Sequence, residues 1–125
     1  MFHYPHNHVE IRDAVAKLCT DFDGKYWQAC DADRAYPSAF VKALTGAGYL
    51  SALIPEEYGG LSLPISAGAA ILEEIHRSGG NAAACHAQMY TMGTVLRHGS
   101  DAQKQQYLPS IADGSMRLQA FGVTE

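Results

Sequence analysis

The sequence predicts an all-α fold, an up-and-down bundle of about five helices with the start of a β-strand at the C-terminus. Apolar residues recur at helical spacing, links containing glycine or proline separate these stretches, and 125 residues suffice for one domain with an ordinary core. We divide the chain into an irregular N-terminus (residues 1–8), a helical domain (residues 9–115) and a first strand (residues 116–125).

The first helix is predicted over about residues 9–34. Its apolar positions recur at intervals of 4, 3, 4 and 7 residues, which places them on one face: Ile11, Val15, Leu18, Phe22 and Ala29. Cys19 and Cys30 return to nearly the same face. Asp23 and Gly24 lie inside this pattern and weaken the prediction of an unbroken helix.

Pro37 ends the first helix, because the residue before a proline is kept out of helical geometry, and Ser38 suits the start of the next. The second helix is short and stops between Gly46 and Gly48. A tight turn follows at residues 54–61, where two glycines after Tyr58 indicate left-handed backbone or a surface against which other backbone packs closely.

A third helix begins near residues 64–66. Its predicted buried stripe consists of Gly68, Ile71, Leu72 and Ile75, and the side chains predicted to point outward are Glu73, Glu74, His76 and Arg77. Asn81 suits the cap of a fourth helix over residues 82–98. This fourth helix carries almost no charge before Arg97, so we expect it to be buried on most sides.

A fifth helix opens at Asp101 and is expected to end near Leu108, because Pro109 breaks or kinks a helix. A turn follows at residues 112–115. Polar and apolar residues then alternate loosely over residues 116–124, which is typical of a strand.

Composition excludes several classes of function. The net charge is −4, with 9 scattered basic residues, so no cluster of positive charge predicts a nucleic-acid partner. No apolar run approaches the roughly 20 residues that span a bilayer. The 3 cysteines form no disulfide-like framework and are typical of small buried side chains in a reducing compartment. We therefore expect a soluble, cytoplasmic protein.

Two pairs of residues suggest chemistry, and each has a simpler interpretation. Glu73 and His76 match half of the motif of di-iron bundles, but a second motif and further inward glutamates are missing, so a solvated pair is favoured over a metal site. Cys85 and His86 are adjacent and point about 100° apart on a helix, which prevents a nucleophile–base pair. The residues by themselves indicate no catalytic group and no metal ligand.

Several segments in order nevertheless resemble one family, the N-terminal α-helical domain of FAD-dependent acyl-CoA dehydrogenases. The resemblance covers nearly the whole chain from Ile11 onward. It rests on Ala47-Gly48-Tyr49-Leu50, Ile54-Pro55-Glu56-Glu57-Tyr58-Gly59-Gly60-Leu61, Glu73-Glu74-Ile75, Gly99-Ser100 with Gln103-Lys104, Tyr107-Leu108-Pro109, and Phe121-Gly122-Val123-Thr124-Glu125.

The resemblance implies a three-part enzyme in which this domain precedes a middle β-domain and a C-terminal helical bundle. Its reaction is the α,β-dehydrogenation of an acyl-CoA thioester: a carboxylate takes the α-proton and the β-hydrogen passes as hydride to N5 of the flavin. The carboxylate belongs to the C-terminal bundle, so no acidic residue here is assigned as the base. The resemblance also implies an electron-transfer acceptor as partner and a homo-oligomer for the complete enzyme.

Site residues follow from the same resemblance. Phe121, Val123 and Thr124 are expected to contact the polar edge of the flavin ring, with core packing as the alternative for Phe121 and Val123. Residues expected to line the acyl pocket lie on the fourth helix: Ala84, Cys85, Gln88, Met89 and Met92. For each of these, ordinary core packing is an equally good interpretation.

Three other functions stay open at this point. A related flavin enzyme such as an acyl-CoA oxidase would share this domain, and a metal-binding bundle would need a fuller set of ligands. A stand-alone helical binding or assembly module would need a polar surface of its own. A fragment of the larger enzyme would instead expose an apolar seam and be inactive, with little affinity for FAD.

Overall fold

The computed structural model describes residues 7–120, 122 and 124. These residues form six α-helices and two short 3₁₀-helices, and none of them lies in a strand, which confirms the all-α prediction. The α-helices are α1 (Val9–Cys19), α2 (Gly24–Ala32), α3 (Ser38–Gly46), α4 (Ile65–Arg77), α5 (Ala83–His98) and α6 (Asp101–Asp113). The 3₁₀-helices are η1 (Tyr49–Ser51) and η2 (Glu56–Tyr58).

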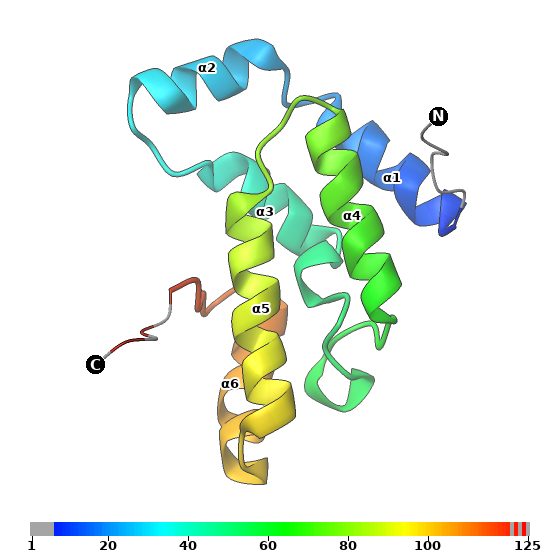
Figure 1. Cartoon of the computed structure of the whole chain (residues 1–125), viewed down its shortest axis with the longest axis vertical. Helices are drawn as coiled ribbons and strands as arrows, with labels where there is room; N and C mark the ends of the chain where they lie inside the picture. Colours follow the sequence, from blue (N-terminus) through cyan, green and yellow to red (C-terminus); the bar gives the residue numbers. More distant parts are fainter. Residues whose placement is uncertain (1–6, 121, 123, 125) are drawn as a thin grey trace.

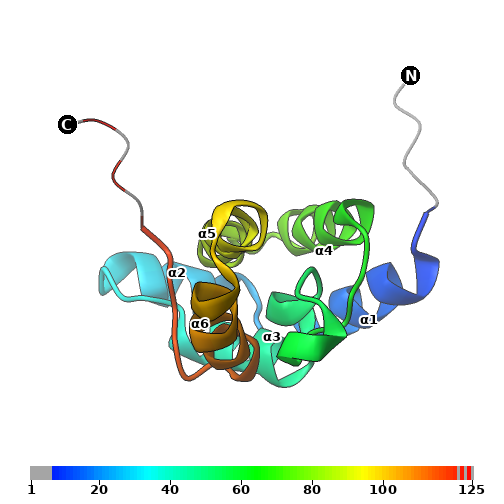
Figure 2. The same cartoon turned by 90° about the horizontal axis from the view of Figure 1, so that it is seen from below.

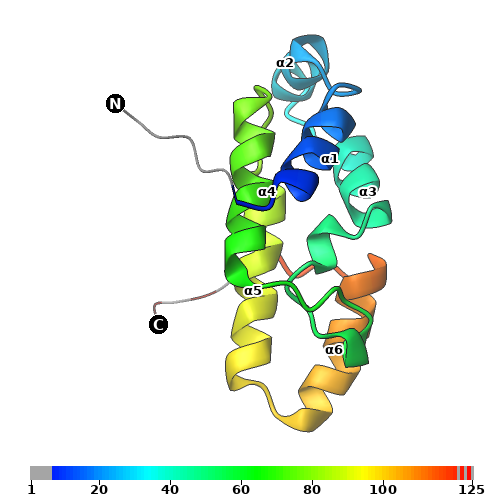
Figure 3. The same cartoon turned by 90° about the vertical axis from the view of Figure 1, so that its right-hand side faces the viewer.

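The helices lie in two layers, which are seen end-on in Figure 2 and from the side in Figure 3. Helices α4 and α5 lie side by side in one layer, and α1, α3 and α6 form the other. Helix α2 lies across one end, while α4, α5 and α6 run alternately up and down (Figure 1). The core between the layers contains aliphatic residues of α3, α4 and η1, sulfur-containing residues of α5, and Leu108 and Ile111 of α6.

Residues 9–34 form two helices, so the prediction of one continuous helix is wrong. The side chain of Asp23 accepts a hydrogen bond from the backbone nitrogen of Tyr26 at 3.1 Å and thereby caps α2. A short polar residue at this point stabilises a new helix start better than a helix interior. Helix α2 consequently turns away from the core: Ala29, expected on the buried face, is exposed.

The turn at residues 54–61 confirms both expectations for its glycines. Gly59 has a φ of 91°, in the left-handed region. A Cβ added to Gly60 would overlap the carbonyl group of Ile54, so the backbone passes there too closely for any side chain. The carbonyl of Ile54 accepts the backbone N–H of Ser62 at 2.9 Å, which ties the end of the turn to its beginning.

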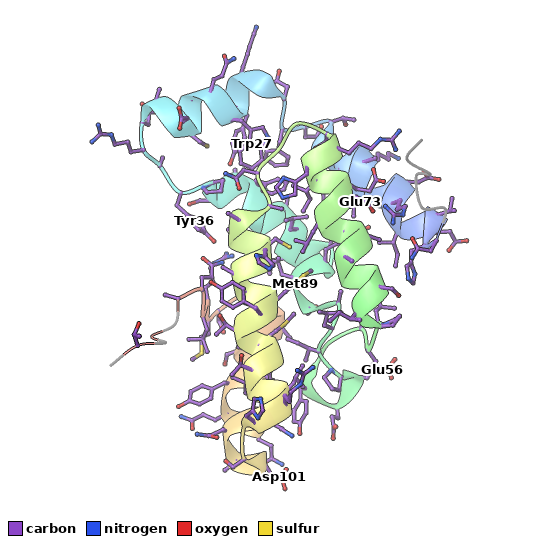
Figure 4. The ribbon with its side chains drawn as sticks, viewed as in Figure 1. Trp27, Tyr36, Glu56, Glu73, Met89 and Asp101 are labelled. Carbon is purple, nitrogen blue, oxygen red and sulfur yellow. The ribbon has the colours of Figure 1, made fainter. Side chains whose placement is uncertain are left out.

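One residue of α4 lies opposite to its prediction. Glu74 was expected to point outward but is 3% exposed. The guanidinium of Arg12 on α1, itself 6% exposed, contacts Glu74 at 3.3 Å and Glu73 at 2.8 Å. A charged residue enters a core only with such a partner, and the sequence of one helix does not show what the neighbouring helix supplies. Glu73 lies where α4 meets α1 (Figure 4).

Helix α6 continues through Pro109 to Asp113, so its predicted end near Leu108 is wrong. The helix starts with a capping box, in which Ser100 and Gln103 each bond the other's backbone nitrogen, at 3.2 and 2.9 Å. Pro109 has no backbone N–H, so the carbonyl of Gln105 loses its helical hydrogen bond. Both residues are exposed, so water can replace the missing donor. Leu108 and Ile111 bury the opposite face and hold the helix in place.

Candidate functional site

Helix α5 has a buried face and an open face. Its buried residues follow the helical spacing of i, i+3, i+4 and i+7: Cys85, Gln88, Met89 and Met92. His86 is exposed and Tyr90 half-buried. The expectation that this helix is buried on most sides is therefore wrong, because none of the helices in the described part of the chain lies over its outer face (Figure 2).

An apolar groove runs between α4 and α5 on this open face. Its first part is a hollow of about 260 Å³ lined by Leu53, Ile65, Gly68, Ala69, Leu72, His86, Met89 and Tyr90. A second hollow of about 330 Å³ shares Leu53 and Ile65 and extends the groove along Leu63, Gly93, Leu96 and Arg97. Ile65 is 79% exposed, which is unusual for a large aliphatic side chain.

Most of the residues predicted to line an acyl pocket lie on the buried face of α5, and Met89, at 6% exposure, lies at the edge of that face next to the groove. Met89 lines the groove and lies between α5 and α4 (Figure 4). Cys85, Gln88 and Met92 are at most 1% exposed and face the core, and half-buried Ala84 lies near the first turn of α5. The assignment of these five residues to substrate binding stays a prediction.

Sequence reasoning missed two residues that line the groove, His86 and Tyr90. Their rings meet edge to face, with centroids 5.2 Å apart. They are four residues apart on a helix that is otherwise rich in alanine and methionine, so they lie on one face. That spacing of two polar aromatic residues was the available signal, but only the packing of α4 shows which face is open.

Gln88 is an unusual buried residue. Its side chain is 1% exposed, and neither its amide nitrogen nor its amide oxygen has a hydrogen-bond partner within the described residues. Burying an amide without partners costs about 1–3 kcal/mol. The buried amide of Gln88 therefore lowers the stability of the fold, and it belongs to the residue that precedes the groove-lining Met89.

The three cysteines differ in environment. Burial raises the pKa of the Cys85 thiol to about 12. Burial also raises the pKa of Cys19, although a hydrogen bond with Ser78 opposes the effect. Cys30 on α2 is only half-buried. Because the thiolate is the reactive form, both burial and the raised pKa protect Cys85.

We expect iodoacetamide at pH 8 to modify Cys30 of the folded protein first and to leave Cys85 unmodified, as measured by mass spectrometry of peptides over time. In the denatured protein all three cysteines should react at similar rates, which provides the control. Equal rates for Cys85 and Cys30 in the folded protein would contradict the placement of Cys85 in the core.

Gln119 attaches the C-terminal segment to the first turn of α5. Its side chain donates to the carbonyl of Ala84 at 3.2 Å and accepts from the hydroxyl of Tyr36 at 3.0 Å. Of the three residues predicted to bind the flavin, Phe121 and Val123 lie outside the described residues, while Thr124 is exposed. Residues 116–120 carry no strand pairing, so the strand predicted for residues 116–125 is not seen in its described part.

Two further observations concern metals and membranes. Glu73 pairs with Arg12, and His76 is exposed. Throughout the described part of the chain, no three or more His, Cys, Asp or Glu residues lie close enough to hold a metal ion. In the same part, every helix is too short or too polar to cross a membrane.

Comparison with known proteins supports the resemblance seen in the sequence. A sequence model described as "Acyl-CoA dehydrogenase, N-terminal domain" matches residues 5–115. A probable acyl-CoA dehydrogenase of Mycobacterium tuberculosis is 32% identical over 128 residues, which cover 100% of this chain and 33% of that protein. A probable acyl-CoA dehydrogenase of Mycobacterium leprae is 31% identical over the same shares. The chain thus spans about a third of the length of these curated relatives.

Proposed function

The chain belongs to the acyl-CoA dehydrogenase family through its N-terminal domain, and from this membership we propose that it forms one wall of the active site of a FAD-dependent enzyme. The reaction we propose is the α,β-dehydrogenation of an acyl-CoA thioester. The structural observation that supports it is the open apolar groove between α4 and α5, which a single domain leaves uncovered.

The groove suits an alkyl chain. Its walls are aliphatic on the α4 side, and on the α5 side Met89 offers a flexible side chain that adapts to irregular ligands. Tyr90 and His86 supply ring surface at the wall, and His86 is exposed at the rim. We propose that the acyl chain lies against this face of α5, while Cys85, Gln88 and Met92 support it from behind.

We propose that the C-terminal segment carries the first contacts to FAD. A Cβ at Gly122 would meet no atom within 4 Å, and Thr124 is exposed, so both residues are accessible to a ligand. The hydroxyl of Thr124 can donate to a ring oxygen or accept from a ring N–H. When bound, FAD supplies the hydride-accepting ring atom that no amino acid provides.

The remaining parts of the activity lie beyond these residues. We propose that the carboxylate base, the electron acceptor's contacts and the contacts of a homo-oligomer are supplied by other parts of a longer enzyme, and that this domain alone is inactive. We also propose a cytoplasmic location, which the free thiols of Cys19, Cys30 and Cys85 on three separate helices support. An acyl-CoA oxidase would use the same groove and differ in its electron acceptor.

The exposed surface favours a fragment of a larger enzyme over a stand-alone module. Ile65, which lines the groove, is 79% exposed, and Leu61 in the turn after η2 is 44% exposed. A self-sufficient bundle is expected to keep such a surface polar. We propose that another part of the enzyme covers this seam.

The proposal predicts a particular effect of filling the groove. In the longer protein that carries this chain, Ala69→Trp should lower kcat/KM for a long-chain acyl-CoA by about tenfold or more, because a large ring on α4 takes the space of several methylene groups. A short-chain acyl-CoA should be affected less. The measurement is dye-coupled oxidation of both substrates by the purified flavoprotein.

Ala102→Trp provides the matched control, since Ala102 is an exposed alanine on α6 away from the groove. It should leave both substrates unaffected. A purified wild-type protein without FAD, or one inactive toward every acyl-CoA, would overturn the proposed function. Equal losses for both variants would show that the groove does not hold the acyl chain.

A further inference from the structure

Gln119 occupies a junction between three parts of the fold. Its side-chain nitrogen donates to the carbonyl of Ala84 on α5 at 3.2 Å, and its side-chain oxygen accepts from the hydroxyl of Tyr36, which lies between α2 and α3, at 3.0 Å. Its backbone carbonyl also receives the hydroxyl of Tyr90 at a longer distance of 3.5 Å. Both functional groups of one amide are therefore used to hold the segment in place.

The rest of the segment has few other attachments. Met116 donates its backbone N–H to Ser110 at 2.9 Å, which closes the turn after α6. The side chains of Met116 and Leu118 pack on the core, whereas Arg117 and Ala120 are exposed. Among residues 117–120, side-chain hydrogen bonds to the helical layers come from Gln119. Gln119 thus fixes where the chain departs from the domain.

The path of residues 116–120 brings the segment close to the groove. Residues 116–120 run from the end of α6 past the flank of α5 to the layer that α4 and α5 form (Figure 2). The groove opens on that layer, and Tyr90 both lines the groove and contacts Gln119. Displacing Gln119 would therefore change the position of Ala120, the next residue, relative to the groove.

We propose that Gln119 is a positioning residue for the cofactor: it clamps the segment between Tyr36 and Ala84 so that Gly122 and Thr124 contact the flavin beside the acyl groove. This inference rests on the proposed function of the segment. The clamp itself depends only on the hydrogen bonds of Gln119. The two parts can therefore be tested separately.

The first test uses this 125-residue chain and Gln119→Ala. The backbone NMR order parameters of residues 118–120 should fall from about 0.85 in the wild type to below about 0.6 in the variant. Those of α5 and α6 should stay unchanged. Gln105→Ala is the control, because Gln105 is an exposed glutamine on α6. Unchanged order at residues 118–120 in Gln119→Ala would overturn the clamp.

The second test measures FAD affinity in the longer protein. Gln119→Ala should weaken FAD binding by about tenfold, the effect expected for losing the two side-chain hydrogen bonds that align the segment, one exposed and one part-buried. Tyr36→Phe removes only one of them and should weaken binding by about threefold. Gln119→Glu should also weaken binding by about threefold, because a carboxylate still accepts from the hydroxyl of Tyr36 but cannot donate to the carbonyl of Ala84.

The outcomes separate the inference from the proposed function. A wild-type protein that binds FAD, together with a Gln119→Ala variant that binds it equally well, would overturn the role of Gln119 alone. A wild-type protein that binds no FAD would overturn the proposed function and the cofactor role of Gln119 with it. The visible absorbance of bound flavin should also shift in Gln119→Ala, which a purely structural loss of stability would not cause.

Discussion

Replacing Gly60 by alanine should destabilise the domain by at least about 3 kcal/mol, or prevent its folding. The added Cβ would overlap the carbonyl group of Ile54, and Ile54 itself is fully buried. That carbonyl also holds the N–H of Ser62, so a shift large enough to relieve the overlap would break the hydrogen bond that closes the turn. Urea unfolding followed by circular dichroism measures the effect.

Gly46→Ala is the matched control. Gly46 is the last residue of α3, and a Cβ added there meets no atom within 4 Å. Since alanine favours a helix over glycine, the variant should be unchanged or more stable by up to about 1 kcal/mol. Similar stabilities for Gly60→Ala and the wild type would show that the backbone of Gly60 does not pass close to the carbonyl of Ile54.

Replacing Arg12 by methionine should destabilise the domain by about 3–5 kcal/mol. Arg12 and Glu74 are 6% and 3% exposed, and removing one member leaves the other charge buried without its partner across the helix interface. Methionine keeps most of the volume and reach of the side chain, so the loss should come from charge and hydrogen bonds. Thermal and urea unfolding both measure it.

The double variant Arg12→Met with Glu74→Met tests the cause. An apolar pair of similar volume should recover most of the loss, because neither charge remains to be desolvated. Arg77→Met is the control: Arg77 also approaches Glu74, at 3.8 Å, but its side chain is 63% exposed, so the loss should be at most about 1 kcal/mol. A double variant as unstable as Arg12→Met would assign the effect to packing instead.

The site was only partly predictable from the sequence. Resemblance to a family pointed to the segment containing Thr124 and to α5, but not to the face of α5 that is open. Met89, Cys85 and Met92 have similar chemistry, and a helix pattern alone does not separate the member that lines a groove from those that face the core. Gln119 carried no signal at all, because its partners Tyr36 and Ala84 lie 83 and 35 residues away.

The sequence by itself determined the features that depend on neighbouring residues: an all-helical chain, the start of α3 at Ser38, the left-handed Gly59, and the close approach at Gly60. These follow from backbone sterics and from hydrogen bonds that span a few residues. Tertiary structure decided the rest, including the burial of Glu74, the passage of α6 through Pro109 and the open face of α5. Each depends on whether a distant element or water lies against the residue. The free energy of that contact cannot be read from a local stretch of sequence.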